Sequence, residues 1–277
     1  MLIENVALDK YTSLRTGGVA KYLYLPEDQE QLSRFLADNQ QAIALLGLGS
    51  NFLLRDQGFD GVLIKLSNLN QLSLTGHSVQ AQAGVTLAKL SRFVQDSGQY
   101  GAEFLAAIPG NVGGALAMNA GCFGSEIWDF VTQIETMDHQ GRQHQRQVSD
   151  FSIGYRQVHS AVRDEFFVSA TFDFSKAKAD QQVKTLLKKR QDTQPTGLPS
   201  CGSVFKNPPG HYAAQLIEGA GLKGFCLGGA CVSDKHANFI INQHQASATD
   251  VENLIKYIQQ VVKSKFDVAL ETEVQIL

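Results

Sequence analysis

One hydroxyl-bearing residue, Ser203, lies in the segment PSCGSVFKNPPG at 199–210, shortly before Lys206 and Asn207. A nucleophilic serine usually occurs in a G-x-S-x-G elbow or an S-x-x-K pair, because these arrangements activate an otherwise weak nucleophile. The elbow is absent, and the lysine three residues after Ser203 gives a spacing that often arises by chance. Taken alone, this segment favours a turn serine that precedes a strand over a nucleophile.

The segment LLGLGSNFLLRD at 45–56 combines glycines with short polar side chains. An apolar stretch runs into Gly47, Gly49, Ser50 and Asn51. Glycines let the backbone approach a phosphate and turn its N–H groups toward it, while Ser and Asn add side-chain donors. The segment lacks the Gly-Lys-Ser/Thr of a Walker loop and the G-x-G-x-x-G that opens a helix. Two interpretations therefore stay open, a pyrophosphate site and a simple tight turn.

A second glycine-rich segment, AAIPGNVGGALAMNAGCFG at 106–124, is also rich in small residues. Small side chains allow the backbone to approach a flat or charged ligand, although a tightly packed loop would need them equally. Two such segments, each after apolar strands, favour a dinucleotide with an extended pyrophosphate. The candidate ligand-binding residues here are Pro109, Gly110, Gly113, Gly114, Asn119 and Gly121.

Composition and charge argue against several classes of function. The 277 residues, 43% of them hydrophobic, can form one large core or two to three smaller ones. The net charge is −3 and the 24 lysines and arginines are dispersed, so we expect neither nucleic acid nor a membrane surface as partner. The histidines and cysteines lack metal-ligand spacing, so we expect no metal. Without a signal pattern or a run of ~20 apolar residues, the sequence predicts a cytoplasmic protein with reduced thiols.

The elements that must position these segments follow from hydrophobic periodicity. A strand at 19–26, a helix at 27–40 and a strand at 42–47 predict a β-α-β unit, whose sheet continues at 61–66. The pattern then predicts a hairpin turning at Thr75-Gly76, a helix at 87–99, and strands within 131–148 and 165–174. A helix ending at Arg190 and a proline-containing segment at 191–200 indicate a domain boundary.

The part of the chain after this boundary begins with the Ser203 segment. It contains a short helix at 212–221 and a longer one at 249–266, for which Thr249 and Glu252 match a capping box. Apolar residues recur with helical spacing along the longer helix. In the final strand, 268–277, alternation places Glu273 on the face opposite Leu270 and Val274.

Seven segments of the chain occur in the order found in one known family. They are TSLRTGG, GLGSN, IPG-VGGA-NAG, GYR, PS-GSVFKNP, VSDKHANFIIN and LETEVQIL, which together extend from 12 to 277. Through them the chain resembles the UDP-N-acetylenolpyruvoylglucosamine reductases. These FAD enzymes complete the synthesis of UDP-N-acetylmuramate, a precursor of bacterial peptidoglycan.

The resemblance implies an α+β fold with a two-subdomain FAD-binding region of the vanillyl-alcohol-oxidase (PCMH) type and a C-terminal α/β substrate-binding domain. We place the FAD-binding subdomains at 1–66 and 67–176 and the substrate-binding domain at 177–277. Asn111 replaces the usual Ser or Thr, which removes an expected hydroxyl contact to the flavin phosphate, and Cys201 replaces the usual Ala. The short interval from Arg156 to Ser203 matches a compact form of the family that lacks a tyrosine-bearing substrate loop.

The resemblance also implies a chemical role for three residues. The family reaction adds a hydride from reduced flavin to the enolpyruvyl methylene carbon, and a proton must then reach the α-carbon. Ser203 matches the proton donor, which needs no activating histidine because the enolate is strongly basic. Arg156 matches the cation that stabilises the enolate. Glu273 matches the third catalytic position, and we expect it to be protonated or to orient the acid through water, since a carboxylate facing an anion is unfavourable.

The expected ligands follow from the same resemblance. FAD would bind without a covalent bond, because Ser50 and Asn51 occupy the place of the histidine that tethers it in related folds. NADPH would supply the hydride, and Lys206, Asn207 and His236 would contact UDP-N-acetylglucosamine enolpyruvate. We expect Gly49→Val to lower FAD retention more than it harms the fold, and we expect a monomer.

Two other classes of protein stay open at this point. Another flavoprotein of the same fold, such as an oxidase or a 2-hydroxy-acid dehydrogenase, would keep the glycine-rich segments without needing Ser203, Arg156 and Glu273 together. A flavin- or nucleotide-binding protein without catalysis would keep the same segments and lose the acid. All three catalytic positions are filled, so the sequence favours the reductase.

Overall fold

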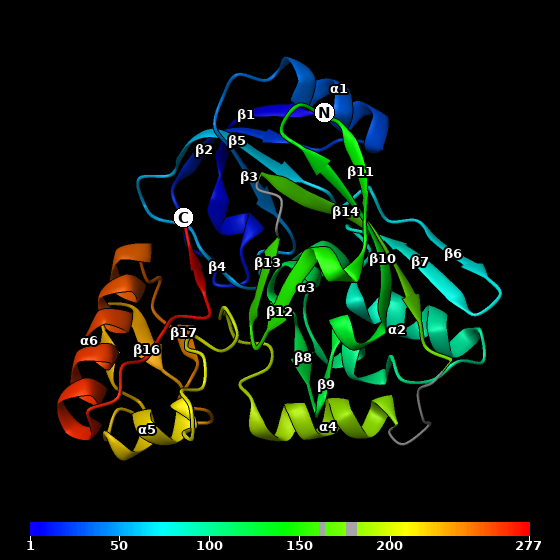
Figure 1. Cartoon of the computed structure of the whole chain (residues 1–277). Helices are drawn as coiled ribbons and strands as arrows, with labels where there is room; N and C mark the ends of the chain where they lie inside the picture. The colour runs from blue at the N-terminus through cyan, green and yellow to red at the C-terminus, as the bar shows by residue number, and fades with distance from the viewer. Residues whose placement is uncertain (161–163, 176–181) are drawn as a thin grey trace. The chain divides into compact units, whose positions relative to one another are not determined.

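The computed structural model of the chain describes residues 1–160, 164–175 and 182–277, which divide into two compact units. The first unit comprises Met1–Leu2, Leu23–Leu48 and Val62–Lys189. The second unit comprises Ile3–Tyr22, Gly49–Gly61 and Arg190–Leu277. The domain boundaries predicted from the sequence stay a proposal, and the one at 176/177 lies outside the described residues. Figure 1 labels many of the helices and strands of both units.

A five-stranded antiparallel sheet is the main sheet of the first unit, with the strand order β11-β10-β14-β7-β6 (Figure 1). Thr75 pairs with Ser78 in the β6–β7 hairpin, so its turn consists of Gly76 and His77, one residue later than predicted. The predicted strands are confirmed. Their bounds are β6 (Leu72–Thr75), β7 (Ser78–Gln82), β10 (Val131–Asp138), β11 (Gln143–Arg146) and β14 (Glu165–Asp173).

Helices and two small hairpins complete the core of the first unit. Val79, Ala81, Ala170 and Phe172, on one face of the sheet, are buried in a core that also holds Trp128. The Trp128 indole N–H donates to the carbonyl of Leu116 at 2.8 Å, which satisfies its one polar group. The elements are α2 (Leu87–Asp96), α3 (Val112–Met118), α4 (Val183–Thr193), β8 (Gly121–Cys122), β9 (Ser125–Glu126), β12 (Phe151–Gly154), β13 (Gln157–Ser160) and 3₁₀ turns at Glu103–Ala107, Ile127–Phe130 and Val148–Asp150.

The predicted β-α-β unit near the N-terminus is also confirmed. Strand β3 pairs in parallel with β5, in a register that sets Leu46 opposite Lys65. Helix α1 begins after Asp28, whose carboxylate accepts a hydrogen bond from the N–H of Gln31, and it buries Leu32 and Leu36. The elements are β1 (Leu2–Ala7), a 3₁₀ turn (Leu8–Tyr11), β2 (Val19–Tyr24), α1 (Gln29–Asp38), β3 (Ile43–Leu46) and β5 (Phe59–Lys65).

The second unit has its own hydrophobic core, to which Leu14, Leu53 and Phe205 contribute together with the inner face of a long helix, α6. A three-stranded antiparallel sheet has the order β15-β16-β17, and β18 pairs in parallel with β4. The bounds are β4 (Phe52–Leu53), α5 (Ala213–Gly219), β15 (Cys226–Leu227), β16 (Ala230–Val232), β17 (Ile240–Asn242), α6 (Ala248–Phe266) and β18 (Gln275–Ile276).

Helix α6 begins one residue before the predicted start, and its capping box differs from the prediction. The N-cap is Ser247, whose hydroxyl accepts from the N–H of Asp250, while the Asp250 carboxylate accepts from the N–H of Ser247. Thr249 instead donates its hydroxyl to Asp56 at 2.6 Å, and Glu252 pairs with Arg55 at 2.9 Å. The prediction of a Thr249/Glu252 capping box is therefore wrong.

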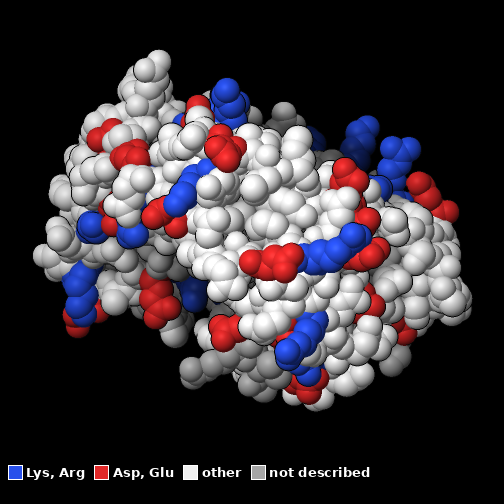
Figure 2. All heavy atoms as spheres, turned by 90° about the horizontal axis from the view of Figure 1, so that it is seen from above, with Lys and Arg blue, Asp and Glu red and all other residues white. Residues whose placement is uncertain are grey.

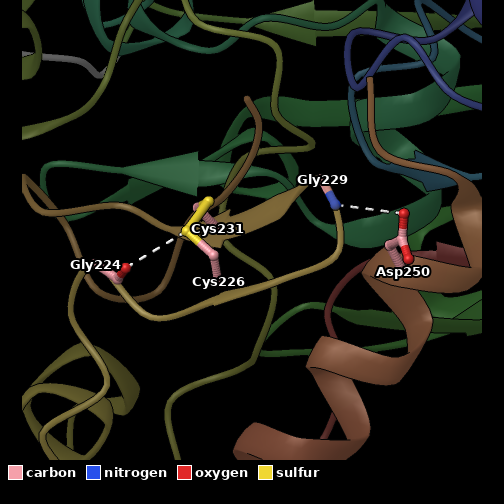
Figure 3. Close-up of a disulfide and its surroundings, with 5 residues drawn as sticks. All are labelled: Gly224, Cys226, Gly229, Cys231 and Asp250. Carbon is pink, nitrogen blue, oxygen red and sulfur yellow. Dashed lines mark hydrogen bonds between the residues drawn. A yellow bond between two sulfur atoms is a disulfide. The ribbon is translucent and has the colours of Figure 1, made fainter. Parts of the chain in front are cut away.

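A disulfide joins Cys226 and Cys231, which face each other across the β15–β16 hairpin (Figure 3). The expectation of reduced thiols is therefore wrong for this pair. Cys122 and Cys201 lie outside this disulfide, and Cys201 is buried. Gly229, in the turn of this hairpin, donates its N–H to the Asp250 carboxylate at 3.4 Å. This contact links the hairpin to the first turn of α6.

Candidate active site

The two glycine-rich segments contact each other in the first unit at Gly47 and Asn111. Asn111 caps α3 by accepting a hydrogen bond from the N–H of Gly114 at 3.1 Å. A Cβ atom at Gly47 would lie 2.7 Å from the Oδ1 atom of Asn111, which is closer than packed atoms allow. Asn111 therefore holds the helix start, and Gly47 is needed for the close approach of the two segments.

The remaining glycines of the second segment have different reasons for being glycine. A Cβ atom at Gly113 would lie 3.0 Å from the Cβ atom of Ala83, and one at Gly121 would lie 2.5 Å from the Ser125 carbonyl oxygen. Packing within the unit requires glycine at position 121 and leaves little room for a side chain at position 113. At Gly110, by contrast, the nearest atom would be the Cδ1 atom of Leu87 at 3.5 Å, which is ordinary contact. Of these three glycines, Gly110 is the one at which no neighbouring atom of the chain requires glycine.

Arg156 occupies the two-residue turn of the β12–β13 hairpin, with a φ of 55°. Its guanidinium donates to the carbonyl of Gly121 at 2.6 Å and to that of Asn119 at 3.2 Å. These bonds fix the planar group, whose side chain is only 16% exposed. The structure thus brings together Arg156, Asn119 and Gly121, three of the predicted site residues.

Asn119 provides a test of whether the first unit fits the expected FAD. Its Nδ2 atom donates to Glu126 at 2.6 Å and to the Gly154 carbonyl at 3.1 Å. Its Oδ1 atom is buried and accepts no hydrogen bond from any described residue. A buried acceptor without a partner is costly unless a ligand donates to it. Flavin and ribose both carry such donors, so Asn119 fits the cofactor.

The first glycine-rich segment continues in the second unit as Gly49, Ser50 and Asn51. Gly49 has a φ of +68°, and a Cβ atom there would lie 2.0 Å from the carbonyl oxygen of Tyr11. Any side chain at Gly49 would therefore disrupt the backbone of the unit itself. The expectation that Gly49→Val harms FAD retention more than the fold is wrong for this reason.

Ser13 connects this segment to the one that carries Ser203. Its N–H donates to the carbonyl of Gly49 at 3.0 Å, and its hydroxyl donates to the carbonyl of Ser200 at 2.6 Å. The same two segments also lie near each other at Gly202, because a Cβ atom added there would lie 3.9 Å from the carbonyl oxygen of Ser50. Ser13 lies in the segment TSLRTGG, but no role for it was predicted from the sequence. A serine that bridges two loops leaves no local pattern.

Antiparallel pairing with the C-terminal segment places Glu273 beside the Ser203 segment. The N–H of Glu273 donates to the Val204 carbonyl at 2.8 Å, and the N–H of Lys206 donates to the Glu271 carbonyl at 2.9 Å. The side chain of Asn51 donates to the carbonyl of Glu273 at 3.0 Å. The structure thus brings Asn51, Glu273 and the residue after Ser203 together in the second unit. It places Arg156 in the first unit.

The environment of Ser203 suits a hydroxyl that acts on a ligand. Ser203 is half-buried and follows Gly202, whose φ is +76°. Among the described residues, the structure records no hydrogen bond of the Ser203 hydroxyl. Burial raises the pKa of the nearby Cys201 thiol to about 12, so this cysteine stays protonated at neutral pH and is not a nucleophile.

The three predicted substrate-binding residues all lie in the second unit. Lys206 is 25% exposed, with its Nζ atom 3.8 Å from a Glu271 carboxylate oxygen. The Oδ1 atom of Asn207 accepts from the N–H of Ala213 at the start of α5 at 3.0 Å, so its amide nitrogen is turned elsewhere. Burial, reinforced by the charge of Lys223, lowers the pKa of His236, which is therefore neutral at pH 7. The Nδ1 atom of His236 accepts from the N–H of Asn238 at 3.3 Å, which leaves Nε2 as the donor.

Charged residues are scattered over the part of the surface in view. On the face drawn in Figure 2, lysines and arginines alternate with aspartates and glutamates, and neither sign gathers in a large patch. Within the described ranges, no helix combines the length and the apolar character that crossing a membrane requires.

Comparison with known proteins gives the same relatives for both units. Residues 20–146 match the family described as FAD binding domain, and residues 194–277 match the family described as UDP-N-acetylenolpyruvoylglucosamine reductase, C-terminal domain. A UDP-N-acetylenolpyruvoylglucosamine reductase from Nitrosomonas eutropha is 47% identical over 293 residues, which span 100% of this chain and 88% of that protein. One from Coxiella burnetii is 45% identical, spanning 98% of this chain and 93% of that protein.

A solved structure extends the comparison to the fold. The crystal structure of the UDP-N-acetylenolpyruvylglucosamine reductase from Thermus caldophilus is 31% identical in sequence and superimposes with a TM-score of 0.84. The match covers 100% of this chain and 99% of that chain.

Proposed function

The chain belongs to the UDP-N-acetylenolpyruvoylglucosamine reductase family, and we propose that Ser203, Arg156 and Glu273 are its catalytic residues. The protein reduces UDP-N-acetylglucosamine enolpyruvate to UDP-N-acetylmuramate in peptidoglycan precursor synthesis. FAD, when bound, carries the hydride from NADPH to this substrate. The observation that carries this function is the 47% identity to the Nitrosomonas eutropha reductase, which extends across the whole chain. The alternatives of another flavoprotein of the same fold and of a non-catalytic binding protein are thereby set aside.

Ser203 donates the proton to the α-carbon of the substrate in this proposal. Its position supports the role, because the backbone on its C-terminal side is fixed by hydrogen bonds to Glu273 and Asn238. A hydroxyl is a weak acid, but an enolate is a strong base, so proton transfer between them is favourable. The role needs no activated serine, and no histidine has to stand beside it.

Arg156 stabilises the negative charge that builds on the enolate and its carboxylate. A guanidinium held in place by two backbone carbonyls needs no rearrangement when that charge appears, which makes it an effective electrostatic catalyst. Its contacts with the Asn119 and Gly121 carbonyls also support its assignment to the flavin side of the reaction.

Glu273 orients the proton donor. Its backbone pairs with Val204 and accepts from Asn51, so it belongs to the same short region as Ser203. We assign its carboxyl group to the proton-donating side of the site, either protonated or acting through water.

Lys206 and Asn207 contact the diphosphate or sugar of the substrate in this proposal, and neutral His236 donates a hydrogen bond to the substrate from Nε2.

The cofactor residues are those of the two glycine-rich segments. We assign the pyrophosphate and flavin contacts to the backbone at Gly47, Gly49, Pro109, Gly110, Gly113, Gly114 and Gly121 and to the side chains of Ser50, Asn51 and Asn119. FAD is non-covalent in this assignment, since Ser50 and Asn51 offer no imidazole for a tether.

We further propose that the protein is a monomer in the cytoplasm, where its nucleotide substrates are made, and that it binds neither nucleic acid nor a membrane. We propose three domains, at 1–66, 67–176 and 177–277.

An optical experiment tests the function as a whole. The purified protein should be yellow, should lose its colour with NADPH under anaerobic conditions, and should regain it when UDP-N-acetylglucosamine enolpyruvate is added. A protein that binds no FAD on reconstitution would contradict the function. A flavoprotein that NADPH bleaches, but that this substrate does not reoxidise, would contradict the substrate.

A further inference from the structure

Asn238 holds the backbone after Ser203 with both ends of its side chain. Its Nδ2 atom donates to the carbonyl of Phe205 at 2.8 Å, and its Oδ1 atom accepts from the N–H of the same residue at 3.0 Å. Its own carbonyl accepts from the N–H of Val204 at 2.9 Å. Asn238 is 4% exposed and Phe205 is 1% exposed, so water cannot replace these bonds.

The C-terminal segment binds the one backbone polar group of Val204 and Phe205 that Asn238 does not bind. The Val204 carbonyl accepts from the N–H of Glu273 at 2.8 Å. The N–H and carbonyl groups of Val204 and Phe205 are therefore all bonded, three of them to Asn238. This leaves the two residues after Ser203 with one conformation, while Gly202 on the other side contributes the left-handed φ that the turn requires.

We propose that Asn238 is a positioning residue for the proton step, because it holds the Ser203 hydroxyl at the α-carbon of the substrate through Val204 and Phe205. The inference rests on the proposed role of Ser203. An amide is the side chain that fits, because it carries a donor and an acceptor on one planar group. A leucine would fill a similar volume and leave the Phe205 N–H and carbonyl unpaired. An ionised aspartate would keep the acceptor and lose the donor.

The test is anaerobic stopped-flow measurement of both half-reactions in the FAD-loaded Asn238→Ala variant. Flavin reduction by NADPH should keep the wild-type rate, because that step needs no proton donor at the substrate. Reoxidation by UDP-N-acetylglucosamine enolpyruvate should slow about 10- to 100-fold, as expected when a reacting group is displaced by a fraction of an ångström to about 1 Å. Ser247→Ala is the matched control, because it removes a capping bond of α6 in the same unit, and among the described residues no hydrogen bond joins Ser247 to 203–206. It should reoxidise at the wild-type rate.

A double-mutant cycle separates positioning from general destabilisation. In a Ser203→Ala background there is no hydroxyl left to position, so adding Asn238→Ala should cause little further slowing of reoxidation. Equal slowing by Asn238→Ala in both backgrounds, or a wild-type rate in the single variant, would overturn the inference. If Asn238→Ala does not fold, Asn238→Asp enters the same cycle, with the same coupling expected. Ser203→Ala alone tests the proposed acid. A wild-type rate of reoxidation in Ser203→Ala would reject the role of Ser203. Slow reoxidation in Ser203→Ala, with equal further slowing by Asn238→Ala in both backgrounds, would reject only the inference about Asn238.

Discussion

Backbone carbonyls and amides set the geometry of each proposed catalytic residue. Arg156 is fixed by the carbonyls of Asn119 and Gly121, and Glu273 is fixed by Val204 and Asn51. Such contacts leave little trace in sequence, because any residue can supply a carbonyl. The sequence predicted which residues to consider through their resemblance to a family. The sequence could not predict that Ser13 and Asn238 form hydrogen bonds to the segment that carries Ser203.

Replacement of Arg156 separates the two half-reactions at the residue scale. We expect Arg156→Ala to slow flavin reoxidation by substrate about 10²- to 10³-fold, the cost of losing one preorganised donor to a developing anion. Reduction by NADPH should change far less, because no enolate forms in that step. Stopped-flow absorbance of the flavin measures both rates. Arg92→Ala is the control, since the Arg92 side chain is 84% exposed and pairs only weakly with Asp96.

Equal slowing of both half-reactions in Arg156→Ala would contradict the proposed role. It would mean that the guanidinium supports the flavin or the hairpin through its bonds to Asn119 and Gly121. Flavin content after gel filtration distinguishes a lost cofactor from a slowed reaction.

At the scale of elements, periodicity predicted the helices and most of the sheet strands. The strand predicted at 268–277 is wrong in extent, because only β18 (Gln275–Ile276) and an isolated bridge at Thr272 form there. Tertiary contacts decided what periodicity could not. Both Ser247/Asp250 and Thr249/Glu252 have the spacing of a capping box at the start of α6. The pair that forms the box is decided by Asp56 and Arg55, which engage Thr249 and Glu252. Likewise, no cysteine motif predicted the disulfide, because it depends on the register of the β15–β16 hairpin.

Asp56 gives the start of α6 a pH-dependent contribution to stability. Burial raises the pKa of Asp56, but hydrogen bonds from the Thr249 hydroxyl and from the N–H groups of Ala248 and Thr249 outweigh it, so the pKa lies below its ordinary 3.8. A carboxyl group with a lowered pKa stabilises the fold above its unfolded-state pKa, and this contribution is lost as the pH falls through the folded-state value.

We therefore expect Asp56→Asn to destabilise the protein at neutral pH by about 1 kcal/mol, the typical cost of a lost helix cap. The difference from wild type should shrink as the pH is lowered through the folded pKa of Asp56. Thermal unfolding midpoints of both proteins across this range measure it. Asp60→Asn is the control, because its side chain is 89% exposed and its ion pair with Lys21 lies at the surface, so its effect on the midpoint should be much smaller. A midpoint difference that does not change with pH would contradict the account.

The disulfide of the β15–β16 hairpin has a measurable contribution. Its sequence separation is 5, and a bridge closing so short a loop is expected to stabilise the fold by about 2 kcal/mol. For a protein of this size, reduction should then lower the unfolding midpoint by about 4–8 °C. Intact mass before and after reduction checks the bridge itself. Cys226→Ser should abolish the response to reductant, Cys122→Ser should keep it, and a wild type that gains no mass on reduction would contradict the bridge.

At the scale of the whole molecule, the chain passes between the two units several times before residue 62. The first glycine-rich segment belongs to both, with Gly47 in the first unit and Gly49 to Asn51 in the second. Of the residues proposed to be catalytic, Arg156 belongs to the first unit, and Ser203 and Glu273 belong to the second. Local patterns in the sequence predict elements one at a time. They therefore predicted a boundary near residue 190, but not that the chain passes between the units several times before residue 62.

In this proposal, Ser203 acts in the reduction of the substrate and not in the reduction of the flavin, and anaerobic stopped-flow measurement of Ser203→Ala tests this most directly. The variant should bind FAD and be reduced by NADPH at the wild-type rate. Its reoxidation by UDP-N-acetylglucosamine enolpyruvate should fall by about 10²- to 10⁴-fold, the usual contribution of a positioned proton donor. Ser203→Cys should recover part of this loss, because a thiol can also donate a proton. Reoxidation of the Ser203→Ala flavin at the wild-type rate would contradict the assignment of Ser203 as the acid.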